Sequence, residues 1–494
     1  MTIHLRAARL PGLAGLHDVT LAEGSVTAVT PHAPGRAGPG EEVDLEGRFL
    51  FPGLWDHHVH FTQWVVTRSR LDLSGARSAA DAIALVTRAV ADRPGTDLLS
   101  GYGFRDGLWP DEPTLAALDA VTGERPVVLV SGDLHCGWLN SPALRSVDVA
   151  PRASGLLRET EWIAALDRLD RRASPPVEGY RAAAAAAAAR GVVGVVEFEN
   201  TDNLTEWPAR VAAGVDHLRV EASVWPQRLE KALADGYRTG AAVDPGRDPH
   251  GLVTVGRLKV VVDGSLNTRT ALCHDPYPGL DPFAPDACGV QSVPPERLRD
   301  LLTAARDGGI LPAVHAIGDR ANTQVLDAFE DLGIAGTVEH AQLVSRDDFE
   351  RFGRLGLTAS VQPEHAVDDR DVADRYWAGR TDRAFAFASL HAAGAVLRLG
   401  SDAPVAPLDP WVAVAAAVDR SRDGREPWHP EQRLPREVAL AASTRGRSRV
   451  RVGDVADVVV LDADPFTVPD AELRDLPVAA TLVGGRFTHD GVRA

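Results

Sequence analysis

In the middle of this chain, short apolar runs alternate with helical stretches. Eight short apolar runs each end in polar residues, and helical stretches such as Arg181–Arg190 and Pro295–Asp307 separate them. A buried strand followed by a helix, repeated eight times, is typical of a TIM-like (β/α)8 barrel. We therefore predict an α/β fold with barrel strands at Phe51–Trp55, Val192–Val196, Leu218–Val224, Leu258–Val262, Ile310–Val314, Gly336–Val338, Leu357–Val361 and Val396–Leu399.

Both ends of the chain show a different pattern, in which short apolar runs lie between turn residues. Three such runs occupy the first fifty residues, and two more lie near the C-terminus among Gly, Asp and Pro. Runs of this kind predict β-strands. Because the two groups flank one long barrel, we expect them to pair into a single small β-sandwich: Thr2–Ala8, Ser25–Val29, Gly47–Phe51, Asp457–Leu461 and Ala480–Val483.

One long segment, from about Thr62 to Pro176, interrupts the alternation of strand and helix. It contains an extra apolar run, Pro126–Val130, that the eight-strand count does not include. We interpret the segment as a domain inserted between the first and second barrel strands, lying over the barrel mouth. The predicted organisation is sandwich 1–50, first barrel strand 51–64, insertion 65–177, remaining barrel 178–444 and sandwich 445–494.

The composition narrows the class of protein. With 494 residues, 45% of them hydrophobic, the chain can bury a large core. The net charge of −17 disfavours nucleic acid as a partner, because no basic stripe is present to neutralise phosphates. No apolar run reaches the roughly 18 residues of a membrane helix, and the first residues lack the apolar segment of a signal peptide. Three cysteines without a CxxC pair suit a reducing compartment, so we expect a cytoplasmic protein.

The first barrel strand runs into a cluster of histidines with the sequence DHHVH. Residues two apart in an extended segment point the same way, so His58 and His60 should present two imidazoles to one site. By the same alternation, His57 should point away from them. A lone histidine at a strand end is more often structural than metal-binding. The pair therefore indicates a metal site only if other strand ends carry further ligands.

Three later strands carry the same kinds of residue at their ends. The fifth delivers His315, the sixth His340 and the eighth Asp402. Catalytic groups of such a barrel collect at the C-terminal ends of its strands. Imidazole and carboxylate suit Zn²⁺ and related divalent ions. The sequence therefore predicts a metal site at the barrel mouth.

Lysine is rare in this chain. Of the 52 basic residues, only Lys231 and Lys259 are lysine, and Lys259 lies in the fourth barrel strand. A neutral amine can react with carbon dioxide, whereas a guanidinium cannot. Carboxylation would explain a lysine here in a chain that otherwise uses arginine; pairing with Asp263, or chance, is the alternative. Lys231 lies in a polar helical context and is expected at the surface.

Six motifs, in this order, resemble the amidohydrolase superfamily and more closely its branch of N-substituted-formamide deformylase-like, or YtcJ-like, proteins. The resemblance covers nearly the whole chain, and DVVVLDADP at 457–465 is similar to the C-terminal sandwich strand of that family. The ordered set is specific, whereas any one motif is weak. The motifs are FPGLWDHHVHF (51–61), KVVVDGSLNTRTA (259–271), HAIGDRAN (315–322), VEHAQ (338–342), VQPEH (361–365) and GSDAPVAPLDPW (400–411).

The resemblance implies a role for each residue at the strand ends. It implies that His58 and His60 bind a first divalent metal ion and that His315 and His340 bind a second. Asp402 would bind metal and accept the proton of the attacking water as general base.

The resemblance also implies that Lys259, once carboxylated, bridges two metal ions, with a single ion as the alternative. We expect Zn²⁺, although manganese, iron and nickel accept the same ligands. A homodimer is expected on the same ground.

Further residues are candidates for binding a small-molecule substrate. One pair follows the lysine strand, one follows the seventh strand, and one lies in the insertion, where a motif resembles a family element that reaches over the active site. For the first pair, loop hydrogen bonds are the alternative, and for the third pair it is packing. The three pairs are Asn267 and Arg269, Gln362 and His365, and His135 and Trp138.

The resulting hypothesis is a metal-dependent hydrolase that cleaves a non-peptide C–N bond, in an amide, an N-formyl group or a related substrate. Metal-activated water would attack, and Asp402 would move the proton to the leaving nitrogen. A deaminase or a cyclic imide or amide hydrolase on the same scaffold is one alternative. A catalytically inactive metal-binding scaffold is another.

Overall fold

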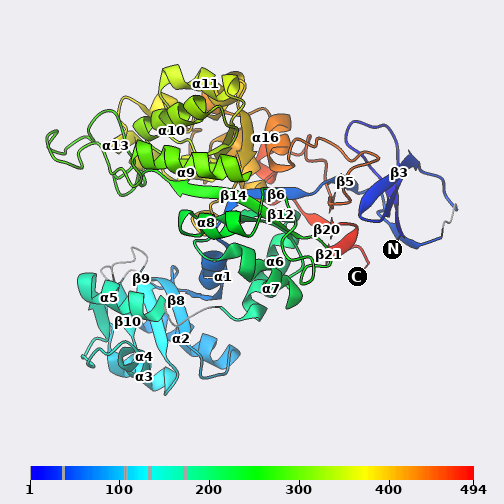
Figure 1. Ribbon diagram of the computed structural model, residues 1–494. Helices are drawn as coiled ribbons and strands as arrows, with labels where there is room; N and C mark the ends of the chain where they lie inside the picture. Colours follow the sequence, from blue (N-terminus) through cyan, green and yellow to red (C-terminus); the bar gives the residue numbers. More distant parts are fainter. Residues whose placement is uncertain are drawn as a thin grey trace. The chain divides into compact units, whose positions relative to one another are not determined.

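The structure is a computed structural model that describes residues 2–35, 39–104, 106, 109–131, 136–170 and 175–493. The chain divides into two compact units. One is formed by Met1–Trp64 together with Tyr180–Ala494, and the other by Val65–Gly179. Figure 1 shows the elements of both.

The larger unit contains a parallel sheet of eight strands, in which each strand pairs with the next one of the barrel along the chain. This order and the helices between the strands confirm the predicted (β/α)8 barrel. In Figure 1, the neighbouring strands β6 and β12 lie at the centre of this unit, with α9, α10 and α16 outside. The strands are β6 (Leu54–Val59), β12 (Val192–Glu197), β13 (Arg219–Val224), β14 (Val253–Val261), β15 (Pro312–Ala316), β16 (Thr337–His340), β17 (Thr358–Val361) and β18 (Val396–Leu399).

The helices between the strands form for visible reasons. In α9, the buried residues Leu298, Leu301, Leu302 and Ala305 recur at helical spacing, and Gly309 ends the helix in the left-handed conformation (φ 78°). The alanine run of α6 is a strong helix former. The helices of this unit are α6 (Val177–Ala188), α7 (Asn203–Ala212), α8 (Pro226–Ala234), α9 (Pro295–Gly308), α10 (Asp319–Leu332), α11 (Phe349–Arg354), α12 (Pro363–Asp368), α13 (Arg370–Tyr376), α14 (Phe387–Ala392), α15 (Pro410–Asp419) and α16 (Arg436–Ser443).

The barrel closes between its first and last strands. The Asp402 N–H donates to the His58 carbonyl oxygen at 2.7 Å, and the His60 N–H donates to the Ala403 carbonyl oxygen at 2.9 Å. Val59 and Ala403 form a parallel bridge. The segment after β18 therefore runs beside the end of β6, which brings the His58–His60 pair next to Asp402.

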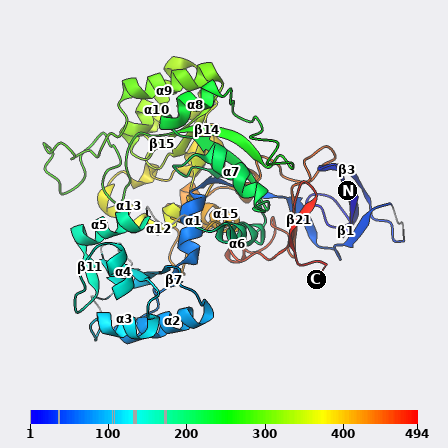
Figure 2. The ribbon, with the colours of Figure 1, turned by 60° about the horizontal axis from the view of Figure 1, so that its bottom comes forward.

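The two ends of the chain form a β-sandwich, as predicted. One sheet has the order β3-β2-β1-β4 and the other β21-β20-β19-β5, and buried side chains of both belong to one hydrophobic core. Figures 1 and 2 show both termini at these strands. Strands β2, β4 and β21 were not predicted. The strands are β1 (Thr2–Ala8), β2 (His17–Ala22), β3 (Ser25–Pro31), β4 (Glu41–Asp44), β5 (Phe49–Pro52), β19 (Val458–Leu461), β20 (Val478–Val483) and β21 (Arg486–Asp490).

The predicted sandwich strand Gly47–Phe51 and the first barrel strand are both present, but the predicted bounds of the barrel strand, Phe51–Trp55, begin too early. Phe49–Pro52 is strand β5, which pairs with β19 of the sandwich, and the barrel begins only at Leu54. The chain passes from one sheet to the other at Gly53, where a Cβ would lie 2.2 Å from the Val193 side chain. Residues 51–55 form one buried apolar run across the two strands, so hydrophobicity alone could not place the boundary.

The smaller unit has its own sheet with the order β11-β10-β9-β8-β7 and two hydrophobic clusters. Trp138 is fully buried in one cluster, with its ring centroid 6.3 Å from that of Trp109. The position predicted for this unit over the barrel mouth stays a prediction. Its elements are β7 (Leu71–Asp72), β8 (Leu99–Phe104), β9 (Val127–Ser131), β10 (Cys136–Leu139), β11 (Leu156–Arg158), α2 (Ala79–Asp92), α3 (Leu115–Thr122), α4 (Ser141–Ser146) and α5 (Glu159–Asp170).

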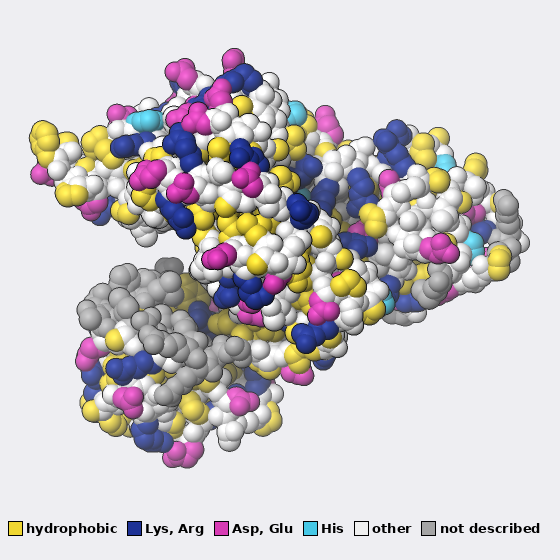
Figure 3. All heavy atoms as spheres, in the orientation of Figure 1, with side chains coloured by type: hydrophobic (Ala, Val, Ile, Leu, Met, Phe, Trp, Pro, Cys, Tyr) yellow, Lys and Arg dark blue, Asp and Glu magenta, His cyan; other side chains and the backbone are white. Residues whose placement is uncertain are grey.

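Acidic and basic side chains are interspersed on the face shown in Figure 3. Among the described residues, none of the helices combines the length and the apolar character that crossing a membrane requires.

The contact between Arg219 of β13 and Asp457 beside β19 joins barrel to sandwich and can be tested. Two guanidinium N–H groups donate to the buried carboxylate at 2.6 and 3.1 Å, and the Gly484 N–H donates to it at 2.8 Å. We expect Asp457→Ala to lower the free energy of unfolding by about 3 kcal/mol, measured by urea denaturation, because buried donors lose their acceptor.

Asp462→Ala is the matched control, since Asp462 pairs with Arg48 at 2.8 Å but is half exposed. That change should cost less than about 1 kcal/mol. Equal losses from the two substitutions would contradict the structural role given to Asp457.

Candidate metal centre

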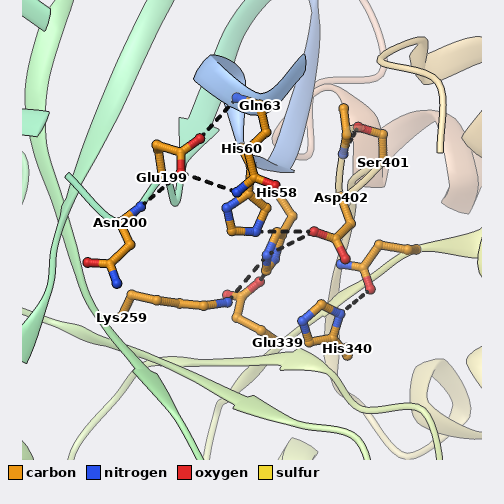
Figure 4. A network of polar contacts seen from close by, with 12 residues as sticks. His58, His60, Gln63, Glu199, Asn200, Lys259, Glu339, His340, Ser401 and Asp402 are labelled. Atoms are coloured by element: carbon orange, nitrogen blue, oxygen red, sulfur yellow. Dashed lines mark hydrogen bonds and ion pairs between the residues drawn. The ribbon is translucent and has the colours of Figure 1, made fainter. Parts of the chain in front are cut away.

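Three side chains meet at the C-terminal ends of the first and last barrel strands, namely His58, His60 and Asp402. The Asp402 Oδ1 lies 3.4 Å from the His60 Nε2 and 3.6 Å from the His58 Nε2. The candidate ligand atoms of these three residues all lie within 4.8 Å of one another. Figure 4 shows the two imidazoles and the carboxylate pointing toward one another.

Asp402 also belongs to a second group, with His340 and His365. Candidate ligand atoms of these three residues again lie within 4.8 Å of one another. His365 lies on α12, just after β17, and is buried. Its Nε2 has no hydrogen-bond partner in the described part of the chain. The carboxylate is thus shared by two sets of imidazoles, one of which contains a histidine that the sequence suggested only for substrate binding.

His315 lies beside this second group and makes other contacts. Its ring centroid is 4.5 Å from that of His340. Its Nε2 lies 3.2 Å from the Gly264 carbonyl oxygen and 3.3 Å from the Asp263 Oδ1. Neither set of close ligand atoms among the described residues includes His315. Its role as a metal ligand stays a prediction.

Two of the imidazoles are held by hydrogen bonds from their far sides. The His58 Nδ1 donates to the buried Glu339 at 2.7 Å, and the His340 Nδ1 donates to the Gln362 Oε1 at 2.9 Å. In both rings the Nε2 is left as the nitrogen that can bind a cation. Gln362, a substrate-binding candidate, is therefore engaged in orienting His340.

The backbone at these strand ends adopts a conformation that is rare for residues with a side chain. His340 (φ 74°), Ala341 (φ 42°) and Asp402 (φ 57°) all lie in the left-handed region. Such positions cost free energy and persist only where surrounding contacts enforce them. Here the barrel-closing hydrogen bond enforces the conformation of Asp402, so the carboxylate has a fixed direction.

Burial and charge adjust the protonation of these groups. Burial raises the pKa of Asp402, but its contact with His60 and the neighbouring imidazoles outweigh this and hold the pKa well below its ordinary value. Burial also lowers the pKa of His58 and His340. The arrangement thus favours an ionised carboxylate among neutral imidazoles, which is the state in which both can bind a cation.

Lys259 lies deep in the barrel next to His58. Its Nζ is 3.3 Å from the His58 Nε2 and 4.4 Å from the centroid of the Phe198 ring, and burial lowers its pKa to about 8. Among the described residues, no carboxylate lies within ion-pair distance of Lys259, so the alternative of a pair with Asp263 is wrong. Asp263 instead accepts backbone N–H groups of Leu272, Ile317 and Gly318.

His57 does not follow the predicted alternation. The pairing of β6 with β12 shifts by one residue between Asp56 and Val59, which is a β-bulge. His57 therefore lines the same interior cavity as Glu339, the residue that holds His58. Its Nδ1 donates to the Leu399 carbonyl oxygen at 3.0 Å.

Asn267 and Arg269, the substrate-binding candidates that follow β14, make other contacts. Asn267 is exposed and donates to Asp369 at 2.8 Å, and the exposed Arg269 guanidinium lies 5.5 Å from the centroid of the Tyr376 ring. Trp138 belongs to the core of the smaller unit. His135 lies outside the described residues. Their roles in substrate binding stay predictions.

The donor set fits a divalent cation. It combines imidazole nitrogens with one shared carboxylate, which are ligands of Zn²⁺ and of several other transition ions. The buried His365 Nε2 and His60 Nδ1 have no partners among the described residues. A bound cation would satisfy the first of these atoms.

Comparisons with known proteins agree with this geometry. The profile of the amidohydrolase family matches residues 41–489. The chain belongs to the amidohydrolase family. The expected family is thereby confirmed, and the chain is a metal-dependent hydrolase by membership.

The chain is similar to several described proteins. It is 29% identical to the putative amidohydrolase YtcJ of Bacillus subtilis, over 91% of this chain and 90% of that protein. It is 26% identical to the N-substituted formamide deformylase of Arthrobacter pascens, over 92% and 91%. The crystal structure of an uncharacterized metal-dependent hydrolase from Pyrococcus horikoshii has a TM-score of 0.78 at 25% identity, over 95% of this chain and 99% of that one.

Sequence reasoning assigned no role to three buried carboxylates around the centre. Glu339 holds His58. Asp56 accepts the N–H groups of Ser401 and His58, and burial raises its pKa to about 7. Glu197 accepts the Phe61 N–H at the start of α1 (Phe61–Ser69). Each of the three lies inside a strand or in a quoted motif. A charged residue within an apolar strand is the sequence signal that could have indicated them.

The contact between Glu339 and His58 can be tested by metal binding. Glu339→Gln keeps the size of the side chain but removes the charge that makes the His58 ring more basic. We expect the affinity for Zn²⁺ or Mn²⁺ to fall by about 10- to 100-fold, measured by competition with a chromophoric chelator.

Glu350→Gln, at an exposed position on α11, is the control and should bind metal like the unmodified chain. A folded Glu339→Gln variant with unchanged affinity would show that this hydrogen bond does not support the metal ligand.

Proposed function

We propose that this chain hydrolyses a non-peptide C–N bond in a small substrate, such as an amide or an N-formyl amine, with a divalent cation at the barrel mouth. The observation that carries the proposal is the position of Asp402, one ionised carboxylate shared by two sets of imidazoles. Membership in the amidohydrolase family and similarity to an N-substituted formamide deformylase support the class of bond.

His58, His60, His340, His365 and Asp402 would hold the cation, with His315 as a further candidate. When bound, a divalent cation lowers the pKa of a water molecule and polarises a carbonyl group. Zn²⁺ is the ion that we propose, on the ground of its preference for imidazole and carboxylate ligands.

Asp402 would carry the proton through the reaction. Its carboxylate accepts a proton from water as the water oxygen attacks the carbonyl carbon, and it returns that proton to the nitrogen as the C–N bond breaks. The products are a carboxylic acid and an amine. The fixed backbone of Asp402 keeps its carboxylate in place. Glu339 and Gln362 hold His58 and His340 in the tautomer with the proton on Nδ1, which leaves each Nε2 available to a cation.

The proposal is tested by offering the metal-loaded chain N-formyl amines, N-acyl amines, cyclic imides and aminopurines, with amine and ammonia release measured separately. We expect amine release from an amide or N-formyl substrate, its loss after chelation and its return when metal is added back. Asp402→Asn should lower kcat by at least about 100-fold.

Asp286→Asn, at an exposed position, is the control for that substitution and should leave turnover unchanged. Ammonia release from aminopurines alone would favour a deaminase. Stoichiometric metal binding with no turnover of any of these substrates would favour a catalytically inactive metal-binding scaffold. Normal turnover by fully metallated Asp402→Asn would overturn the assignment of the base.

We further propose that Lys259 is carboxylated when metal is bound. The neutral amine would form a bond to the carbon of CO2 and release a proton, which gives a carbamate with two oxygen ligands. The depressed pKa supports this, because the neutral fraction of the amine becomes large as the pH passes through about 8.

The carbamate is detectable by ¹³C NMR of metal-loaded protein equilibrated with ¹³C-bicarbonate. We expect one carbamate resonance, which should be absent in Lys259→Met. Lys231→Met is the matched control, because Lys231 is the other lysine of the chain and is exposed beside Asp235. A carbamate signal that survives in Lys259→Met, or no signal in the unmodified chain, would contradict the proposal.

A further inference from the structure

A polar cavity lies inside the barrel next to the candidate metal centre, and Glu339, which holds His58, is one of its lining residues. The cavity has a volume of about 190 Å³. Side chains from seven of the barrel strands line it, together with Arg445, which follows α16. Its three arginines are partly exposed, so solvent ions can reach it. Its ionisable lining residues are His57, Glu221, Arg257, Glu339, Arg398 and Arg445.

The cavity lies nearer the N-terminal ends of the strands than the metal centre does. Arg257 precedes Lys259 by two residues on β14, and Arg398 precedes Asp402 by four on and after β18. Side chains two residues apart on a strand share a face, so Arg257 lies one layer below Lys259. The cavity is therefore on the far side of the metal centre from the mouth at which a substrate would enter.

The cavity lining has three arginines but only two carboxylates, Glu221 and Glu339, so positive charge is in excess there. Arg445 pairs with Glu221 at 2.7 Å. Within the described part of the chain, no carboxylate lies at ion-pair distance from Arg257 or Arg398. Burial and repulsion from the neighbouring guanidinium groups lower the pKa of Arg398 and Arg445. Burying a cation without a partner costs free energy. A bound anion would reduce that cost.

His57 supplies an independent indication of a ligand. It is 6% exposed, it lines the cavity, and its Nε2 has no hydrogen-bond partner in the described structure. Its Nδ1 carries the proton, because the partner of that atom is the carbonyl oxygen of Leu399. In the neutral ring, Nε2 is then an acceptor and needs a donor such as a hydroxyl group.

We propose that this cavity binds a small oxyanion that carries a hydroxyl group, of the hydrogenphosphate or hydrogencarbonate kind. Arg257 and Arg398 bind its oxygens, for which the planar guanidinium is well suited. The hydroxyl group donates to the His57 Nε2. This site is independent of the proposed hydrolysis, because none of these residues belongs to the metal-binding sets.

The test is calorimetric titration of the full chain with potassium phosphate, potassium bicarbonate and potassium sulfate at constant ionic strength. Each titration is made on metal-loaded and on metal-stripped protein, because phosphate bound to a metal ion would require the metal. We expect one phosphate or bicarbonate per chain in both forms, and sulfate, which has no hydroxyl group at neutral pH, at least about tenfold weaker.

Arg257→Gln and Arg398→Gln should each weaken binding by at least about tenfold, since each removes a charged hydrogen-bond donor. Arg247→Gln is the control, because Arg247 is exposed, pairs with Asp244 and is not among the cavity-lining residues. Circular dichroism shows whether the variants fold, and the titration of stripped unmodified protein decides the matter if they do not. Absence of binding to stripped protein, or unchanged binding in both folded variants, would overturn the proposal. Equal affinity for sulfate would overturn the role of His57.

Discussion

The candidate metal centre depends on the contact that closes the barrel. The Asp402 N–H donates to the His58 carbonyl oxygen across the junction of the first and last strands, at 2.7 Å. The two residues are separated by most of the chain, and only closure of the eight-strand sheet brings them together. The same hydrogen bond holds Asp402 in its left-handed conformation (φ 57°), so the contact that closes the barrel also fixes the direction of the carboxylate.

The barrel interior is unusually polar, and its groups are arranged in layers. The upper layer holds the imidazoles and Asp402, and the next holds Lys259 and Glu339, which contact His58 from different sides. Arginines of the lower cavity follow. Burying such groups is costly unless each finds a partner. Most do so, and the ring nitrogens of His57 and His365 that have none among the described residues lie where a ligand would supply one.

Much of the fold could be predicted because buried parallel strands leave a strong pattern. The eight barrel strands follow apolar runs, and the two-residue spacing of His58 and His60 indicated a shared site. Prediction failed where local geometry departs from regular strands. A bulge turns His57 toward the interior, and the chain passes from sandwich to barrel at Gly53 rather than at Phe51. Shifts of one or two residues leave the hydrophobic pattern unchanged, so the sequence carries no signal for them.

The sequence by itself determined the class of fold, the family and the kinds of ligand, because these follow from periodicity and from residue types in a fixed order. Only the tertiary structure decided which groups meet. It brought His365, rather than His315, into the close set with His340 and Asp402, and it assigned Glu339 to His58. The reason is that hydrophobic periodicity reports which face of a strand is buried. Contacts between strand ends depend instead on register, bulges and barrel closure, which involve residues on different strands.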